Sequence, residues 1–383
     1  MPTALLVSCA MYRYSAARMP YALKAAGFRV FAVCPKNALL QFSDFLDGGR
    51  VFAETPNVDD LITVIASTAI ECRPDIIIAC DGRADDTLAL AAQRVNGGGG
   101  EDAAWVRRII GRWYGGGGPR ESLRSLCVEM VASAGIRTPR QMAIDDRTSA
   151  ADLAPLGTPL IVKRDNSSAG CGVAKAESAQ DAIARMADLR IAGPRTEGDG
   201  DGTAGHARIV AQEFVSGPSA SVSFSALDGR MLEAFPYRVL HHQPEPFGPS
   251  SAIEIGNHPA LLDMAQRVVA LLGFSGFGGI DAILPDDGSA PVFLEVNTRP
   301  TQTTHLGSLI GADLCRAMAC ALTGQPYQSD FDPTRRLSMA LFPGEWIRDR
   351  NSPYLTRFYH DVPWQERRMT AAILSITPQL HPG

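Results

Sequence analysis

The sequence predicts a mixed architecture in which a parallel α/β domain precedes an α+β region. Near the N-terminus, apolar segments of strand length alternate with helical segments, a pattern that indicates a parallel sheet. Further along, short apolar strands are separated by turns rich in Gly, Ser and Pro, which is typical of antiparallel hairpins. The chain has 383 residues, of which 45% are hydrophobic, so it can bury a large core divided between two or three domains.

The charge and composition exclude several classes of partner. A net charge of −5 provides no basic face for nucleic acid, and no apolar run is long enough to span a membrane. The apolar stretch at the N-terminus is short and follows no basic region, so we expect a buried first strand rather than a secretion signal, and a cytoplasmic protein. The eight cysteines contain no CxxC pair, so we expect reduced structural thiols.

The first domain is predicted from strands that alternate with helices. The predicted strands cover residues 3–9, 28–34 and 75–79, and the predicted helices cover 15–26 and 58–70. The carboxyl ends of strands in a parallel sheet are where such folds place ligands. Asp81 and Arg83 follow the third strand and are therefore weak candidates for a substrate pocket, and the favoured interpretation is that they begin a loop.

Two tetraglycine runs mark the end of this domain. Residues 97–100 and 115–118 flank a short basic and aromatic segment. Because glycine runs make good linkers, we predict a domain boundary here. Pro119 then opens a predicted helix that ends at Gly135 and carries Arg124 on its flank.

A loop of small residues follows, and it has the composition of a phosphate-binding loop. Residues 165–172 lie between the predicted strands 160–163 and 173–175. Glycines let backbone N–H groups approach an anion closely, and Lys163 would add a point charge. A plain hairpin turn is the alternative. After an acidic, Gly-rich loop at 193–206, we expect two further strands to pair about a short turn. They cover residues 207–215 and 220–227.

The most informative stretch is a predicted hairpin formed by strands 279–284 and 291–297. If it closes about its Gly-containing turn, Asp281 faces Glu295, and Asn297 lies on the same face. Two facing carboxylates repel each other unless a cation lies between them, and Mg²⁺ prefers such oxygen ligands. The alternative is an exposed hairpin whose acids point into water. The last sixty residues are rich in aromatics and Arg, a composition that is common at interfaces and pockets. We nevertheless expect a packed C-terminal cap, with an interface as the alternative.

The order of these elements resembles the ATP-grasp superfamily, in particular its carboxylate–amine ligase-like members, over residues 1–325. The resemblance implies an N-terminal pre-ATP-grasp α/β domain followed by a two-subdomain ATP-grasp fold that holds ATP between two sheets. The implied divisions are the pre-ATP-grasp domain 1–115, the lid subdomain 119–205, the large subdomain 206–325 and a C-terminal cap 326–383.

The resemblance also implies roles for individual residues. Arg124 and Lys163 would contact phosphates, Asp281, Glu295 and Asn297 would bind Mg²⁺ or Mn²⁺, and Arg299 would hold the acyl phosphate or the substrate carboxylate. The remaining ATP contacts would come from the Gly-rich flap (Ser167, Ser168, Gly170, Gly172), the adenine-binding hinge (Gln212, Glu213, Phe214, Val215) and Ser219. Ser219 stands where the family often carries a ribose-binding acid, and Cys171 is unusual in the flap.

These assignments predict an ATP- and Mg²⁺-dependent ligase. It would activate a small-molecule carboxylate as an acyl phosphate for attack by an amine, with Lys163 and Arg299 as the catalytic residues. Two alternatives remain: a bicarbonate-activating enzyme of the carboxylase or carbamoyl-phosphate type, and a nucleotide-binding module without turnover. A dehydrogenase is disfavoured because the N-terminal Gly fingerprint is missing. The sequence is compatible with a homodimer.

Overall fold

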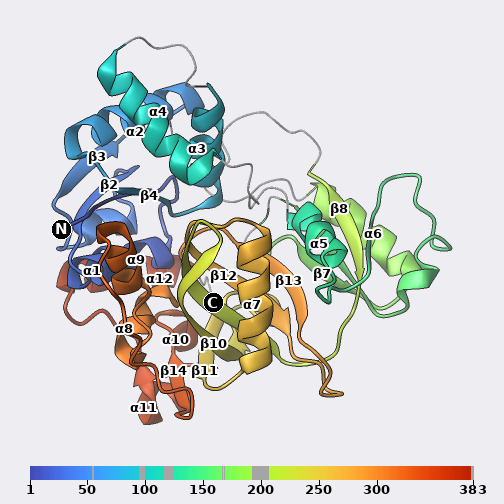
Figure 1. Ribbon diagram of the computed structural model, residues 1–383. Helices are drawn as coiled ribbons and strands as arrows, with labels where there is room; N and C mark the ends of the chain where they lie inside the picture. The colour runs from blue at the N-terminus through green and yellow to red at the C-terminus, as the bar shows by residue number, and fades with distance from the viewer. Residues whose placement is uncertain are drawn as a thin grey trace.

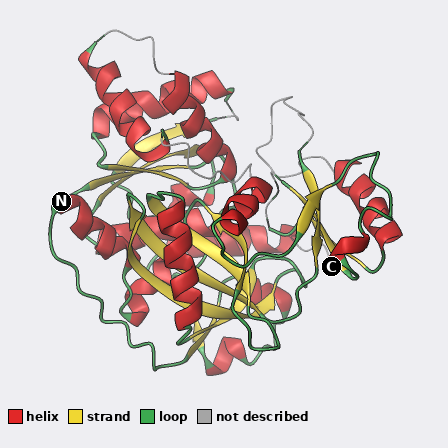
Figure 2. Cartoon of the chain, turned by 45° about the vertical axis from the view of Figure 1, so that its right-hand side comes forward, coloured by secondary structure: helices red, strands yellow, loops and turns green. Residues whose placement is uncertain are grey.

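The computed structural model describes residues 1–53, 56–94, 100–115, 124–165, 167, 169–191 and 207–380. These residues form three sheets, two of four strands and one of seven. The seven-stranded sheet lies between the N-terminal body and the small sheet in both views (Figure 1, Figure 2). The mixed α/β and α+β architecture predicted from the sequence is therefore confirmed.

The N-terminal sheet is parallel, with strand order β3-β2-β1-β4. Its strands are β1 (Thr3–Val7), β2 (Arg29–Pro35), β3 (Gly48–Phe52) and β4 (Ile76–Ala79), and it is flanked by α1 (Tyr14–Ala25) and α2 (Val58–Cys72). Strands β1 and β4 are buried throughout and mostly apolar because both faces are covered, whereas the edge strand β3 is mostly exposed. Leu6 packs with Met19 of α1, while Leu5 packs with Leu61 of α2. The sequence pattern did not predict β3.

Two helices occupy segments for which the sequence predicts a loop and a linker. They are α3 (Gly82–Arg94), which begins directly after Asp81, and α4 (Glu101–Tyr114). In α4, Trp113 Nε1 donates to the carbonyl of Asp75 at 3.2 Å, and the hydroxyl of Tyr114 accepts from the backbone N–H of Ala79 at 2.7 Å. These side chains satisfy the free edge of β4, so the aromatic segment is packed structure and not a linker. The glycines at 97–99 and 116–118 lie outside the described residues.

The small sheet has the order β5-β8-β6-β7 and is antiparallel. Its strands are β5 (Gln141–Ala143), β6 (Leu160–Arg164), β7 (Val173–Ala176) and β8 (Ile209–Glu213). Helix α6 (Ala179–Ile191) packs on one face, against Leu160 and Val162. Ile161 and Lys163 therefore point to the opposite face, toward the large sheet. The predicted acidic loop at 193–206 lies outside the described residues.

The large sheet has the order β13-β12-β9-β10-β11-β14-β15. Its strands are β9 (Ser219–Leu227), β10 (Arg230–His242), β11 (Ser250–Ile255), β12 (Gly276–Ile283), β13 (Val292–Asn297), β14 (Leu337–Ala340) and β15 (Tyr359–His360). Helices α5 (Arg124–Ser133) and α7 (Pro259–Leu271) pack on one face. The predicted pairing of β8 with β9 is wrong, because β8 pairs within the small sheet and β9 within the large one. Residues 214–218 are therefore a crossover between sheets and not a hairpin turn.

The chain after β13 forms three short helices in succession. They are η4 (Thr304–Leu306), α8 (Gly307–Ile310) and α9 (Leu314–Thr323). Gly311, with φ at +85°, separates α8 from α9, and its left-handed conformation ends the first helix. The remaining helices are α10 (Gly344–Arg348), α11 (Tyr354–Arg357) and α12 (Arg367–Leu380). Met369 and Ile373 of α12 pack with Ala17 of α1, so the C-terminal segment covers the N-terminal body.

Among the described residues, no single helix is long and apolar enough to cross a membrane. One pair, Thr304–Ile310 with Leu314–Thr323, reaches that length and composition only when both helices are taken together, and it is bent by 94°.

Candidate active site

The predicted hairpin forms, and its register places Asp281 opposite Glu295. A β-bulge follows Asp281, which locally increases the twist of the pair. Asn297 Nδ2 donates to Asp281 Oδ2 at 2.9 Å, and the hydroxyl of Ser221 on β9 donates to Asp281 Oδ1. The expected geometry of the two carboxylates and the amide is therefore confirmed.

The environment of Asp281 favours a cation. Burial and the carboxylate of Glu295 raise the pKa of Asp281 to about 6, against hydrogen bonds from Ser221 and Asn297 that lower it. A hard cation between the two acids would lower the pKa of Asp281 again, because it stabilises the charged carboxylate. Carboxylate and amide oxygens are suitable ligands for Mg²⁺. Within the described residues, no group of three or more His, Cys, Asp or Glu side chains converges. Two carboxylates suit Mg²⁺, which usually shares its coordination sphere with phosphate and water oxygens.

The pKa of Asp281 predicts how stability changes with pH. The folded protein keeps this proton up to about pH 6, whereas the ordinary carboxyl pKa is 3.8. Between these values the folded state binds more protons than the unfolded state, so the free energy of unfolding falls as pH rises. Urea unfolding of metal-free protein across this range should show this fall, and Asp281→Asn should flatten it. Identical pH slopes for both proteins would contradict the assignment.

Two basic side chains reach the same region from other elements. Arg124, the first residue of α5, donates through Nη1 to the carbonyl of Ser167 at 2.7 Å and lies 3.7 Å from Glu295 Oε2. Burial and the charge of Arg124 lower the pKa of Lys163, while the carboxylates of Glu295 and Asp281 act in the opposite sense. The small sheet, the large sheet and α5 thus bring two cations and two acids to one place.

The start of α5 is fixed by residues that the sequence analysis did not single out. Asp165, at the end of β6, accepts from Ser125 Oγ at 2.5 Å and from the Ser125 backbone N–H at 3.1 Å. Asp165 is 6% exposed, so this link is shielded from water. It holds Arg124 next to the loop that follows β6. No local sequence signal connects two residues forty positions apart.

The flap between β6 and β7 is tightly constrained. Gly170 has φ at +78°, and a Cβ there would lie 2.3 Å from the carbonyl oxygen of Phe247 in the β10–β11 loop. A Cβ on Gly172 would lie 2.2 Å from Ser167 Oγ, which itself donates to the carbonyl of Arg164 at 2.8 Å. Both glycines are therefore required where the backbone turns back under the large sheet. Ser168, also predicted to contact phosphate, lies outside the described residues.

The predicted adenine hinge is the crossover from β8 to β9. Gln212 is buried and donates through Nε2 to Gln141 Oε1 at 3.2 Å, whereas Glu213 forms an ion pair with Arg140. The ring of Phe214 is 40% exposed and lies 5.1 Å from Lys175 Nζ. Val215 follows in the crossover, and Ser219 begins β9 opposite Ile283 of β12. The backbone of this crossover joins the two sheets. That its residues bind the adenine and ribose of ATP stays a prediction.

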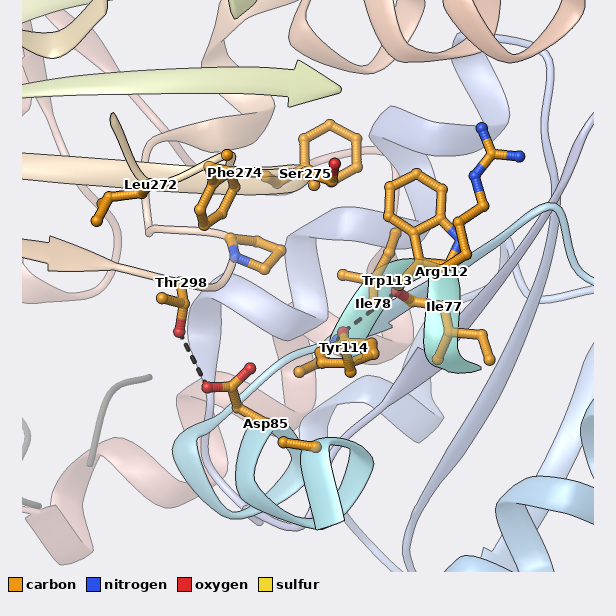
Figure 3. A pocket seen from close by; sticks show the side chains of 16 residues that line it. Ile77, Ile78, Asp85, Arg112, Trp113, Tyr114, Leu272, Phe274, Ser275 and Thr298 are labelled. Atoms are coloured by element: carbon orange, nitrogen blue, oxygen red, sulfur yellow. Dashed lines mark hydrogen bonds between the residues drawn. The ribbon is translucent and has the colours of Figure 1, made fainter. Parts of the chain in front are cut away.

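Arg299 follows Asn297 by two residues and is 9% exposed. It lies near Cys80, at the end of β4, where its charge opposes the rise in that thiol's pKa, which burial chiefly causes. The preceding Thr298 donates to Asp85 Oδ2 of α3 at 3.1 Å, across a cavity also lined by Tyr114 (Figure 3). The N-terminal body therefore touches the loop that carries Arg299.

Two other buried polar residues near the site have structural partners. Asp81 is buried, and its Oδ2 accepts from Ser8 Oγ at 2.9 Å and from the backbone N–H of Cys9 at 2.6 Å. It therefore fixes the loop after β1. His305, close in sequence to the hairpin, is buried with its Nε2 within 3.0 Å of Asp361 and 3.2 Å from Arg18 Nε. This histidine joins an internal cluster with the C-terminal segment.

Comparison with known proteins finds one family match and several relatives. Residues 124–303 match the family described as the ATP-grasp domain. A D-alanine–D-alanine ligase of Nitrosospira multiformis is 28% identical over 184 residues, which cover 45% of this chain and 55% of that protein. One of Laribacter hongkongensis is 29% identical over 188 residues, with 45% and 54% covered. The chain thus spans about half the length of these curated relatives.

Solved structures with the same fold include several ligases and carboxylases. An L-amino acid ligase from Bacillus licheniformis superposes with a TM-score of 0.58 at 16% identity, covering 89% of this chain and 80% of that one. A biotin carboxylase from Campylobacter jejuni superposes with a TM-score of 0.63 at 15% identity, covering 89% and 75%. These likenesses establish the fold. The family match assigns residues 124–303 to the ATP-grasp domain.

Proposed function

We propose that the protein is an ATP- and Mg²⁺-dependent ligase that activates a carboxylate as an acyl phosphate and joins it to an amine. The observation that carries this proposal is the meeting of Lys163, Arg124 and the Asp281–Glu295 pair between two sheets. Phosphoryl transfer depends mostly on positioning and on neutralising charge, which is what such a constellation provides.

Each residue has a distinct role in this proposal. Lys163 and Arg124 balance the negative charge of the β- and γ-phosphates, and the flap N–H groups close over them. Bound Mg²⁺, held by Asp281, Glu295 and Asn297, would neutralise the phosphate oxygens. Arg299 binds the substrate carboxylate and then the acyl phosphate through its planar guanidinium.

Both substrates are proposed to be small molecules. The curated relatives and one structural neighbour are named as ligases of amino acids, which supports testing amino acids first as carboxylate and amine donors. The fold itself does not set the substrate.

The proposal is tested by measuring ADP and phosphate release with pairs of small carboxylates and amines. Release should require Mg²⁺ and should stop when either half of a productive pair is omitted. Release with bicarbonate in place of the carboxylate would favour the carboxylase alternative. Binding of ATP by calorimetry with no ADP formed from any pair would favour a non-catalytic module.

Replacing Lys163 tests the phosphate-binding role. Lys163→Met keeps most of the aliphatic stem but removes the charge, so we expect kcat/KM for ATP to fall about 100-fold. Lys24→Met, in an exposed ion pair with Asp47 on the N-terminal body, serves as the matched loss of one lysine and should change kcat/KM little. Equal activity of the two variants would contradict the role of Lys163.

A further inference from the structure

Strand β9 presents a row of serines on the face of the large sheet that carries Asp281. In the register, Ser221 lies opposite Asp281 and Ser223 opposite Gly279, with Ser225 two positions further along. The alternate residues, such as Val222, pack on the opposite face against α7. Ser223 and Ser225 are both 0% exposed, so this polar row is buried inside the protein.

The loop that carries Arg299 lies directly over this row. A Cβ on Gly279 would lie 2.4 Å from Thr301 Cγ2, so the glycine makes room for the loop. Ser223 Oγ lies 3.0 Å from Thr301 Oγ1 and 2.6 Å from Thr303 Oγ1. The backbone N–H of Thr301 donates to Thr304 Oγ1 at 2.8 Å. Hydroxyl groups thus anchor the loop to the sheet.

A tyrosine on the next strand links this anchor to the acid. Thr303 Oγ1 donates to the hydroxyl of Tyr237 at 3.2 Å, and Tyr237 also contacts the hydroxyls of Ser221 and Ser223. Ser221 in turn donates to Asp281. Burial and the charge of Asp281 raise the pKa of Tyr237 to about 12, so it remains a neutral hydroxyl that can donate as well as accept.

We propose that Ser223, Thr303 and Tyr237 are positioning residues that fix the loop 298–304, and Arg299 with it, relative to Asp281. This inference rests on the proposed function. Each hydroxyl carries one proton that it can donate. Buried hydroxyls that hydrogen-bond one to the next therefore form a directional chain, and its members polarise one another. Arg299 lies only two residues before Thr301, so releasing the anchor shifts the guanidinium. Displacements of about 1 Å in such a site cost about 100-fold in rate.

The two buried serines provide a matched pair of variants. Both lie on the same face of β9, but among the described residues the hydroxyl of Ser225 has no hydrogen-bond partner. We expect Ser223→Ala to lower kcat about 10- to 100-fold while KM for ATP stays within about twofold. Ser225→Ala should leave both constants within about twofold. Tyr237→Phe should behave as Ser223→Ala does, and Thr303→Ser should retain the activity that Thr303→Val loses.

Hydrogen exchange provides a readout independent of turnover. The amide of Thr301 should exchange faster in Ser223→Ala than in Ser225→Ala, while amides of the N-terminal sheet exchange equally in both. Equal exchange at Thr301 would overturn the inference, as would wild-type kcat in both Ser223→Ala and Tyr237→Phe. If the wild-type protein formed no ADP but the exchange difference appeared, the proposed function would fail and the anchoring of the loop would stand.

Discussion

Glu295→Gln is expected to lower kcat/KM for Mg²⁺-dependent formation of ADP about 1,000-fold. The substitution keeps the size and most of the packing of the side chain but removes one of the two facing charges. A neutral amide binds Mg²⁺ far more weakly than a carboxylate, and Arg124 loses the acid that lies 3.7 Å from its Nη1. Initial rates at increasing Mg²⁺ concentration, with a productive carboxylate and amine, measure the effect.

An acid on α5 provides the control for this variant. Glu129 is exposed and forms an ion pair with Arg208 at 2.6 Å. Glu129→Gln should leave the rate within about twofold of the wild-type rate, because an exposed ion pair contributes little to stability. If Glu295→Gln retained more than about a tenth of the wild-type rate, the metal-binding role of Glu295 would be wrong.

Asp361→Asn is expected to lower the free energy of unfolding by about 3–5 kcal/mol, the usual cost of breaking a buried ion pair. Asp361 is 2% exposed, and its Oδ1 lies 2.5 Å from Arg18 Nη2. Arg18 is itself 8% exposed, so the variant leaves a buried guanidinium without its carboxylate. Urea unfolding monitored by Trp fluorescence measures the loss.

An exposed ion pair gives the comparison for Asp361. Arg50 and Glu71 pair on the surface with side chains that are 45% and 60% exposed, so Glu71→Gln should cost about 0–1 kcal/mol. Arg18→Met combined with Asp361→Asn should be less destabilised than the sum of the single variants, because the double variant has no buried unpaired charge. A loss below about 1 kcal/mol for Asp361→Asn would contradict the account of this cluster.

The parts of the site that depend on neighbouring sequence were predicted well. The facing of Asp281 and Glu295 follows from strand alternation and one short turn, both of which are local features. The parallel N-terminal sheet also follows from its apolar strands and intervening helices. In these segments, local propensity and tertiary packing agree.

The sequence prediction was wrong where composition and packing disagree. Glycine runs around α4 indicated a linker, but Trp113 and Tyr114 bind the edge of β4 and give the helix a tertiary reason to form. The short turn after β8 indicated a hairpin, although Leu160 of the small sheet pairs with Glu213. Contacts between segments that are distant in sequence decided both cases.

Long-range polar contacts were beyond sequence reasoning altogether. Arg18 and Asp361 are 343 positions apart, and nothing local to either residue marks the other as its partner. The alternating serines of β9 were visible as a pattern, but a polar face normally points to solvent. The loop 298–304, whose Thr303 Oγ1 lies 2.6 Å from Ser223 Oγ, makes that face an internal one.

The central claim is that the protein transfers the γ-phosphoryl group of ATP to a carboxylate. The direct measurement uses the productive substrate pair with heavy-isotope oxygen in the carboxylate, followed by mass analysis of the released phosphate. An acyl phosphate intermediate places one labelled oxygen from the carboxylate in each phosphate. Phosphate that carries no label, released while the amide product forms, would contradict the claim.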